Sequence, residues 1–362
     1  MQNKIRVFVV DDSIFFRQML IRDLQARSNI EVVGFAASAF EARTKIPSIK
    51  PDVITMDVEM PGLSGIDFLK ELLPKFPIPV ILVSSLNLSV FDALAAGAVD
   101  FVQKPDMSKD YSVKTFFTVL NSKIYIASRA KVNVNLAGKA APGIPAGTAA
   151  NSAAAPAAAP GNLSSGLSLN IQNNMVIAIG ASTGGTEATL DVLKRLPADM
   201  PGIVVTQHMP PGFTKMYAER LDRICKLEVK EAQNGDRIRK GLVLIAPGAL
   251  QMRVEKDLKG YYVTCQEGEK VNGHRPSVDV LFHSVAKKIG KNALGIIMTG
   301  MGRDGAEGLL AMRQAGSFTI GQDKESCVVY GMPMVAYDIG GVCIQASCSN
   351  ISNVLLGQLR KL

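Results

Sequence analysis

The chain has 362 residues, of which 47% are hydrophobic and 20% are charged, and its mean hydropathy is +0.17. This length and composition exclude wholesale disorder and favour two globular domains. The apolar runs are shorter than the roughly 20 residues that cross a bilayer, and two aspartates closely follow the short apolar run at the N-terminus. We therefore expect a cytoplasmic protein without direct membrane insertion.

The net charge of +8 is spread along the chain rather than gathered on one element. Residues 1–127 hold 14 basic and 14 acidic side chains, residues 128–170 hold three basic and no acidic ones, and residues 171–362 hold 23 and 18. A nucleic-acid binder usually concentrates its basic residues on one element. The sequence therefore predicts no nucleic-acid partner.

A segment rich in alanine and proline divides the chain. Residues 137–161 contain 12 alanines, four prolines and four glycines, and the prolines interrupt any helix after a turn or two. We expect a first domain over residues 1–127, a flexible linker over 128–170 and a second domain over 171–362.

The first domain alternates short apolar runs with amphipathic stretches. Runs typical of buried strands occur at residues 4–10, 30–36, 51–57, 79–85 and 99–103, and residues 13–27 have helical spacing. Five such β–α units predict a flavodoxin-like, doubly wound parallel sheet.

Acidic residues lie where these strands end. Asp11 and Asp12 follow the first strand, and Asp57 and Glu59 follow the third. Carboxylates that converge without a cation repel one another, and oxygen ligands suit Mg²⁺. With Ser84 and Lys104 after the last two strands, the set is typical of a phosphoryl site, although each aspartate taken singly is also a common helix cap.

Residues 4–121 resemble a response-regulator receiver domain through VVDDS, ITMDVEMPGLSG, ILVSS and VQKP. The resemblance implies that Asp57 accepts a phosphoryl group from a histidine kinase. It also implies that Asp12 and the carbonyl of Glu59 bind Mg²⁺ with Asp57, that Asp11 assists through water, and that Ser84 and Lys104 contact the phosphoryl group.

The second domain also alternates predicted strands with amphipathic stretches, but less regularly. Buried parallel strands are predicted at residues 174–180, 202–207, 242–247 and 293–299, and residues 251–257 and 261–267 resemble an inserted polar hairpin. We expect a Rossmann-like, doubly wound parallel sheet with this hairpin as an insertion.

A possible nucleophile follows the first of these strands. Residues 180–184 match G-x-S-x-G, which places Ser182 on a sharp strand-to-helix turn with the amides of Thr183 and Gly184 available to an oxyanion. A glycine-rich turn capped by Ser182 is the structural alternative. A nucleophile also requires a base and a residue that orients the base.

His208 ends the next strand and is therefore the candidate base, because it should lie beside Ser182 at the same edge of the sheet. Asp304, just before a predicted helix, is the candidate orienting acid. The structural alternative is that its carboxylate interacts only with the dipole of that helix. For His274, in a loop, and His283, on a helix, a surface or packing role is the better interpretation.

Residues 300–305 also match the dinucleotide-binding pattern G-x-G-x-x-G, with Asp323 about 18 residues later. The physical fit is poor, because the Asp304 carboxylate would repel a pyrophosphate at the helix N-terminus.

The motifs GASTGG, QHMPPGF, HRPSVDVLF and TGMGRDG, in this order after a receiver domain, resemble the bacterial chemotaxis protein-glutamate methylesterases. That family hydrolyses glutamate methyl esters, and deamidates glutamines, on cytoplasmic helices of chemoreceptors without a cofactor. The resemblance implies Ser182 as nucleophile, His208 as base, Asp304 as orienting acid, and the amide of Met301 with that of Thr183 in the oxyanion hole. A receptor-binding module without catalysis is the alternative.

Overall fold

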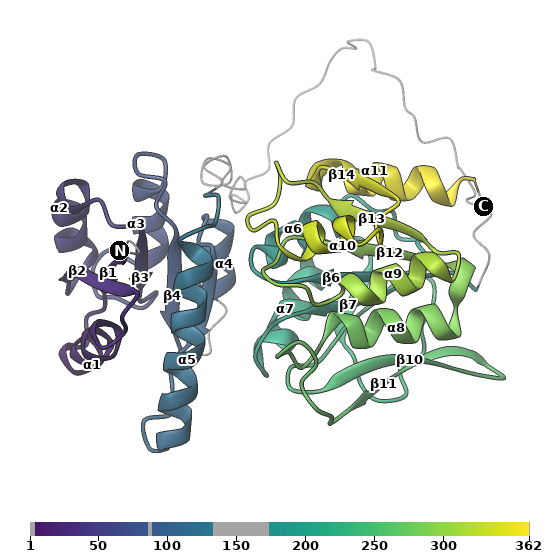
Figure 1. The fold of residues 1–362 in the computed structure, drawn as a ribbon, viewed down its shortest axis with the longest axis horizontal. Coiled ribbons are helices and arrows are strands. Elements are labelled where there is room, and N and C mark those ends of the chain that lie inside the picture. Colours follow the sequence, from purple (N-terminus) through teal and green to yellow (C-terminus); the bar gives the residue numbers. More distant parts are fainter. Residues whose placement is uncertain (1–3, 86–88, 133–173, 362) are drawn as a thin grey trace, which may run out of the picture.

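The computed structural model describes residues 4–85, 89–132 and 174–361, which form two parallel sheets, each with helices on both faces (Figure 1). Most of the predicted linker, residues 133–170, lies outside the described residues. The predicted fold class, two doubly wound α/β units with an inserted hairpin, is confirmed.

The first sheet has the flavodoxin-like strand order β2-β1-β3-β4-β5. Each predicted strand is present to within two residues: β1 (Ile5–Val10), β2 (Ile30–Ala36), β3 (Val53–Met56), β4 (Val80–Ser84) and β5 (Asp100–Gln103). The helices are α1 (Ile14–Gln25), α2 (Ala39–Ile49), α3 (Gly65–Leu72), α4 (Ser89–Ala95) and α5 (Asp110–Ala127). Helices α1 and α5 cover one face of the sheet, and α2, α3 and α4 cover the other.

The second sheet has seven parallel strands in the order β14-β13-β12-β6-β7-β9-β8. Its central strands are β6 (Val176–Ala181), β7 (Gly202–Gln207), β9 (Leu242–Ile245) and β12 (Ala293–Ile297), which match the four predicted runs. Three further strands complete it: β8 (Glu228–Glu231), β13 (Phe318–Gln322) and β14 (Ile344–Ala346). The edge strands β8 and β14 are short and partly exposed, so they lack the apolar run by which a buried strand is predicted.

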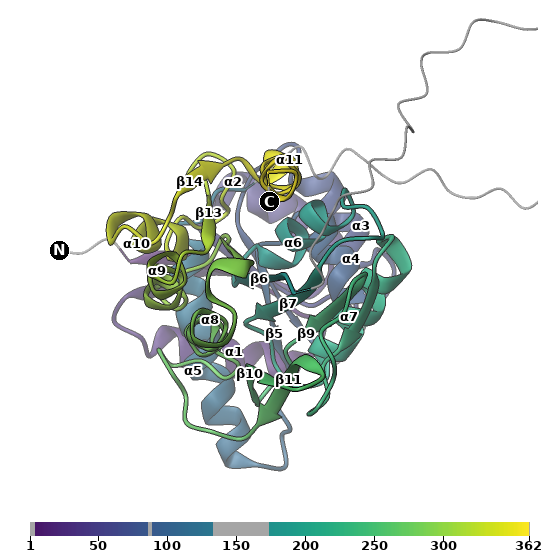
Figure 2. The same ribbon diagram turned by 90° about the vertical axis from the view of Figure 1, so that its right-hand side faces the viewer.

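Helices pack against both faces of this sheet, as Figure 2 shows. One group comprises α6 (Gly185–Leu193), α7 (Phe213–Ile224) and α11 (Cys348–Leu359). The other comprises α8 (Val278–Lys288), α9 (Ala306–Gln314) and α10 (Met332–Asp338), with a single 3-10 turn at Gly290–Asn292. The predicted hairpin is a separate antiparallel pair, β10 (Gln251–Asp257) and β11 (Gly260–Gln266), packed against α8.

The two units touch where α4 and β5 of the first meet α6 and α7 of the second, and Figure 1 shows α4 on the side of the first unit that faces the second. Phe91 stacks on Tyr217 with ring centroids 5.7 Å apart, and Phe101 meets Phe213 at 4.5 Å. These aromatic contacts join the cores of both units into one apolar cluster. Around these aromatic residues the contact between the units is therefore apolar.

Within the described ranges, none of the helices has the length and apolar character that crossing a membrane requires.

Candidate active site at the edge of the second sheet

Ser182 lies directly after β6, on the turn that leads into α6. The turn requires glycine at position 184, where φ is +76°. The amide of Ser182 donates to the carbonyl of Thr299 at 3.0 Å, which ties this turn to the end of β12. Gly300 approaches so closely that an added Cβ would lie 2.6 Å from the Cβ of Ser182.

His208 follows β7, the neighbour of β6, and its ring lies between Ser182 and Asp304. The Nδ1 atom is 3.1 Å from the Oγ of Ser182, and Nε2 is 2.7 Å from Oδ2 of Asp304. In this geometry the Nε2–H tautomer donates to the carboxylate and leaves Nδ1 free to accept the serine proton. The structure thus brings together the three residues predicted from separate strand ends.

Asp304 is almost completely buried, with 1% of its surface exposed. Its carboxylate accepts five hydrogen bonds, from the side chains of His208, Asn272 and Ser277 and from the amides of Val278 and Asp279. Burial alone would raise the pKa of this carboxyl, but the hydrogen bond and charge of His208, with those of Asn272 and Ser277, outweigh it and hold the pKa well below its usual range. Asp304 therefore stays ionised.

The two amides predicted for an oxyanion hole belong to the residues that follow Ser182 and Gly300. Thr183 follows Ser182, and Met301 follows Gly300, which packs on Ser182. Within the described part of the chain, neither the Thr183 amide nor the Met301 amide has a hydrogen-bond acceptor. Both donors are thus available to an oxygen bound beside Ser182.

Several residues that support this site were not predicted from the sequence. Asn272 and Ser277 belong to the loop between β11 and α8, and Gln207 donates to the carbonyl of Ser182 at 2.8 Å. His274, interpreted as a surface or packing residue, stacks on His208 with ring centroids 3.6 Å apart. His283 is exposed, as expected. The only sequence signal for His274 was its place in the motif HRPSVDVLF.

The position of Asp304 also makes dinucleotide binding at residues 300–305 unfavourable. Its carboxylate fills the turn and accepts the amides at the N-terminus of α8, not of the following helix α9. A pyrophosphate would have to displace this buried anion.

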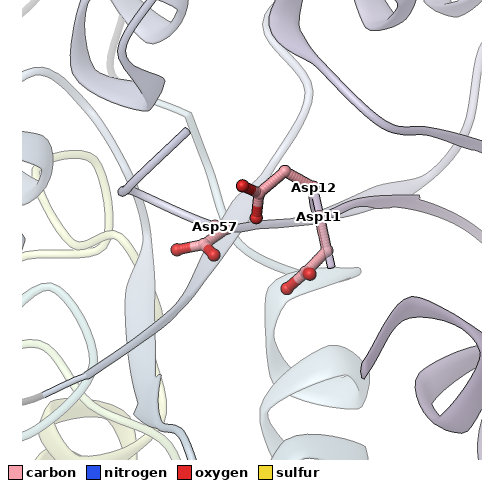
Figure 3. Close-up of side chains that lie close together, drawn as sticks. All are labelled: Asp11, Asp12 and Asp57. Carbon is pink, nitrogen blue, oxygen red and sulfur yellow. The ribbon is translucent and has the colours of Figure 1, made fainter. Parts of the chain in front are cut away.

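A second polar cluster lies at the edge of the first sheet. Oxygen atoms of Asp11, Asp12 and Asp57 lie within 4.8 Å of one another (Figure 3). Lys104 approaches Asp57 at 2.6 Å and Asp11 at 3.1 Å. Burial raises the pKa of the Asp11 carboxyl, and the charge of Asp57 adds to this, while Lys104 opposes it. One ammonium therefore does not fully compensate the three acids.

The remaining predicted residues of this cluster are also at the strand ends. Ser84 is buried, and its Oγ has no hydrogen-bond partner in the described part of the chain. The amide of Glu59 donates to Oδ1 of Asp57 at 3.0 Å. The cluster offers only oxygen ligands around a partly uncompensated negative charge, which fits a hard divalent cation.

The two units also meet beside Ser182. The Oγ1 of Thr183 donates to Oδ2 of Asp100 at 2.7 Å, and Lys123 pairs with the other oxygen of that carboxylate. Asp100 belongs to β5 of the first unit, whereas Thr183 directly follows Ser182. The first unit therefore contacts the immediate surroundings of the proposed nucleophile.

Comparison with known proteins agrees with this organisation. A family model described as response regulator receiver domain matches residues 7–111, and one described as CheB methylesterase matches residues 177–355. The protein-glutamate methylesterase/protein-glutamine glutaminase 2 of Syntrophomonas wolfei is 50% identical over 359 residues, covering 99% of both chains. The corresponding Escherichia coli protein is 43% identical over 361 residues, covering 99% of this chain and 97% of its own.

One solved structure resembles the second unit. The crystal structure of the Thermotoga maritima CheB methylesterase catalytic domain is 35% identical and superimposes with a TM-score of 0.51 over 52% of this chain and all of its own. Full-length similarity to the curated relatives, together with both family models, shows that the chain belongs to the family of receiver-linked protein-glutamate methylesterases/protein-glutamine glutaminases.

Proposed function

We propose that this chain hydrolyses glutamate methyl esters, and deamidates glutamines, on cytoplasmic helices of chemoreceptors under the control of phosphorylation. One observation carries the proposal: Ser182, His208 and Asp304 form a continuous chain of hydrogen bonds at 3.1 and 2.7 Å. A histidine kinase of the cytoplasm serves as phosphodonor. The reaction serves chemotactic adaptation.

The geometry supports an acyl-enzyme mechanism. Nδ1 of His208 accepts the proton of Ser182 as Oγ attacks the side-chain carbonyl of the substrate, and Asp304 stabilises the imidazolium. The amides of Thr183 and Met301 stabilise the oxyanion. His208 then protonates the leaving group, which departs as methanol or ammonia, and activates the water that hydrolyses the acyl-enzyme.

Control requires the cluster on the first sheet. We assign Asp57 as phosphoacceptor, with Ser84 and Lys104 contacting the phosphoryl group and Asp11 assisting through water. Mg²⁺ would be held by Asp12, Asp57 and the carbonyl of Glu59. When bound, the cation supplies the positive charge that lets a second anion approach Asp57.

We further propose the division of the chain into a receiver domain (1–127), a linker (128–170) and a catalytic domain (171–362). In the arrangement described, Asp100 of the receiver contacts Thr183 beside the nucleophile. Such a contact restricts access of a receptor helix, and phosphorylation of Asp57 weakens it.

The test is methanol release from membranes that contain methylated receptors, measured with and without a phosphodonor. Wild-type protein should release methanol and react with a fluorophosphonate probe, and Ser182→Ala should lose both. Ser349→Ala, which removes an exposed serine of α11, is the matched control. Receptor binding by the wild-type chain without methanol release or labelling would instead establish the non-catalytic module.

A further inference from the structure

His274 covers one face of the proposed catalytic base. Its ring lies parallel to that of His208, with centroids 3.6 Å apart and an interplanar angle of 7°. The two nitrogen atoms of His208 already face Ser182 and Asp304. The stack therefore constrains the remaining freedom of the ring, which is tilt out of its own plane.

Hydrogen bonds hold the loop that carries His274 in place. Val271 and His274 exchange main-chain hydrogen bonds at 2.9 and 3.0 Å, and Gln251 donates to the carbonyl of His274 at 3.3 Å. Asn272, in the left-handed region at φ +52°, donates to Asp279 at 2.6 Å and to Asp304 at 3.0 Å. The loop is thus anchored on the same carboxylate that orients His208.

The surroundings keep the His274 ring uncharged near neutral pH. Burial lowers the pKa of His274 to about 4, and the charge of His208 adds to this. Lys123 of the receiver and Lys270 of the loop act in the same direction, whereas Asp304 opposes them. A neutral aromatic face favours a cation placed over it.

We propose that His274 is a positioning residue whose neutral ring holds the plane of His208 and stabilises the imidazolium that forms when His208 accepts the Ser182 proton. The proposal rests on the proposed esterase function. It concerns the transition state rather than substrate binding, so it predicts an effect on kcat rather than on KM.

The experiment uses the full chain, phosphorylated by acetyl phosphate, with methanol release from methylated receptor membranes as the assay. His274→Ala should lower kcat about tenfold with KM changed less than about twofold. His274→Phe keeps a flat neutral ring and should retain kcat within about threefold of wild type. His283→Ala, which removes the exposed imidazole of α8, should leave both constants unchanged.

The outcomes separate stacking from other roles. Unchanged kcat in His274→Ala would overturn the proposal while leaving the esterase function intact, whereas absence of methanol release by the wild-type chain would refute that function itself. Equal loss of kcat in His274→Phe and His274→Ala would show that the ring nitrogens act, not the stacked face. An increase in KM alone would show that His274 acts in substrate binding, which would also overturn the proposal.

A spectroscopic measurement checks the positioning directly. The chain has three histidines, so the ¹⁵N signals of the His208 ring can be assigned by substitution. We expect the Nε2–H tautomer in wild type and His274→Phe, and averaged tautomer signals in His274→Ala. An identical His208 signal in all three proteins would contradict the proposal.

Discussion

Asp304 is held as an anion by its donors rather than by solvent. Five hydrogen bonds converge on its carboxylate, two of them from amides at the N-terminus of α8. Charged hydrogen bonds inside a protein are strong, and a helix N-terminus adds positive potential. His208, the proposed base, is therefore oriented by a fixed negative charge.

Asp304→Asn keeps the side-chain volume but removes this charge, so His208 loses both the preferred tautomer and the stabilisation of its cation. We expect kcat for methanol release to fall roughly 10⁴-fold with little change in KM. Ser277→Ala removes only one of the five donors and should have a much smaller effect. A near-normal rate in Asp304→Asn would contradict the assigned role.

The pH dependence of unfolding should show the burial of His274. Its pKa falls from 6.5 when unfolded to about 4 when folded, so the unfolded chain takes up the proton first. Stability contributed by this residue is therefore fully present above about pH 6.5 and is lost progressively as the pH falls toward 4. The free energy of unfolding falls by at most about 3 kcal/mol over this range, because partial contact of the ring with solvent reduces the effect.

Denaturant unfolding at several pH values measures this slope, which His274→Phe should lack. The lowered pKa of Asp304 acts in a different window, since its contribution is lost only below the unfolded value of 3.8. An identical slope between pH 6.5 and 4 in wild type and His274→Phe would contradict the expectation.

At the scale of elements, the turn after β12 packs directly on the turn after β6. An alanine methyl at position 300 would lie 2.4 Å from the sulfur of Met332 and 2.6 Å from the Cβ of Ser182. Gly300→Ala should therefore displace the nucleophile and lower kcat at least tenfold, since small misplacements of reacting groups are costly.

Gly357 provides the matched control, because an added methyl there meets no atom within 4 Å and the residue lies inside α11. Gly357→Ala should leave kcat unchanged and raise stability by about 0.5–1 kcal/mol. Equal activity of the two variants would show that the close packing at Gly300 is unimportant for catalysis.

The edge of the first sheet should accept phosphate only when its negative charge is compensated. Asp57→Ala should abolish incorporation of ³²P from a phosphodonor, and EDTA should abolish it in the wild-type chain. Asp67→Ala, which removes an exposed carboxylate of α3, should incorporate phosphate normally. Labelling that persists in Asp57→Ala would point to another acceptor.

At the scale of the whole molecule, the receiver packs against the catalytic domain through aromatic residues and reaches Thr183 with Asp100. The sequence predicts a flexible linker over residues 128–170. A flexible linker would give such a contact an effective concentration near the millimolar range, so that a weak interface would hold much of the population closed. We expect the fragment 171–362 to release methanol faster than the unphosphorylated full chain. Phosphorylation should raise the rate of the full chain toward or beyond that of the fragment.

Asp100→Ala should raise the activity of the unphosphorylated chain, because it removes the contact with Thr183, while Asp67→Ala should not. Equal rates for the fragment and the unphosphorylated full chain would refute inhibition by the receiver. The receiver would then serve targeting or activation alone.

Much of this organisation could be predicted from the sequence. Ser182 and His208 each follow a buried apolar run, and parallel strands bring their carboxyl ends to the same edge of a sheet, so their proximity followed from local pattern alone. The same reasoning applied to Asp11, Asp57, Ser84 and Lys104. Local hydrophobic pattern determines strands, and strand order then places whatever lies at their ends.

Other contacts were decided only by tertiary packing. His274 and Asn272 lie on a loop about 65 residues after His208, and no periodic pattern shows that this loop folds back over the His208 ring. Likewise, Asp304 accepts a hydrogen bond from an amide of α8 rather than from the helix that follows it in the chain. Asp100 of the first unit contacts Thr183 of the second. Such contacts depend on how loops and surfaces pack over long distances in the chain, whereas the sequence pattern determines mainly the local elements.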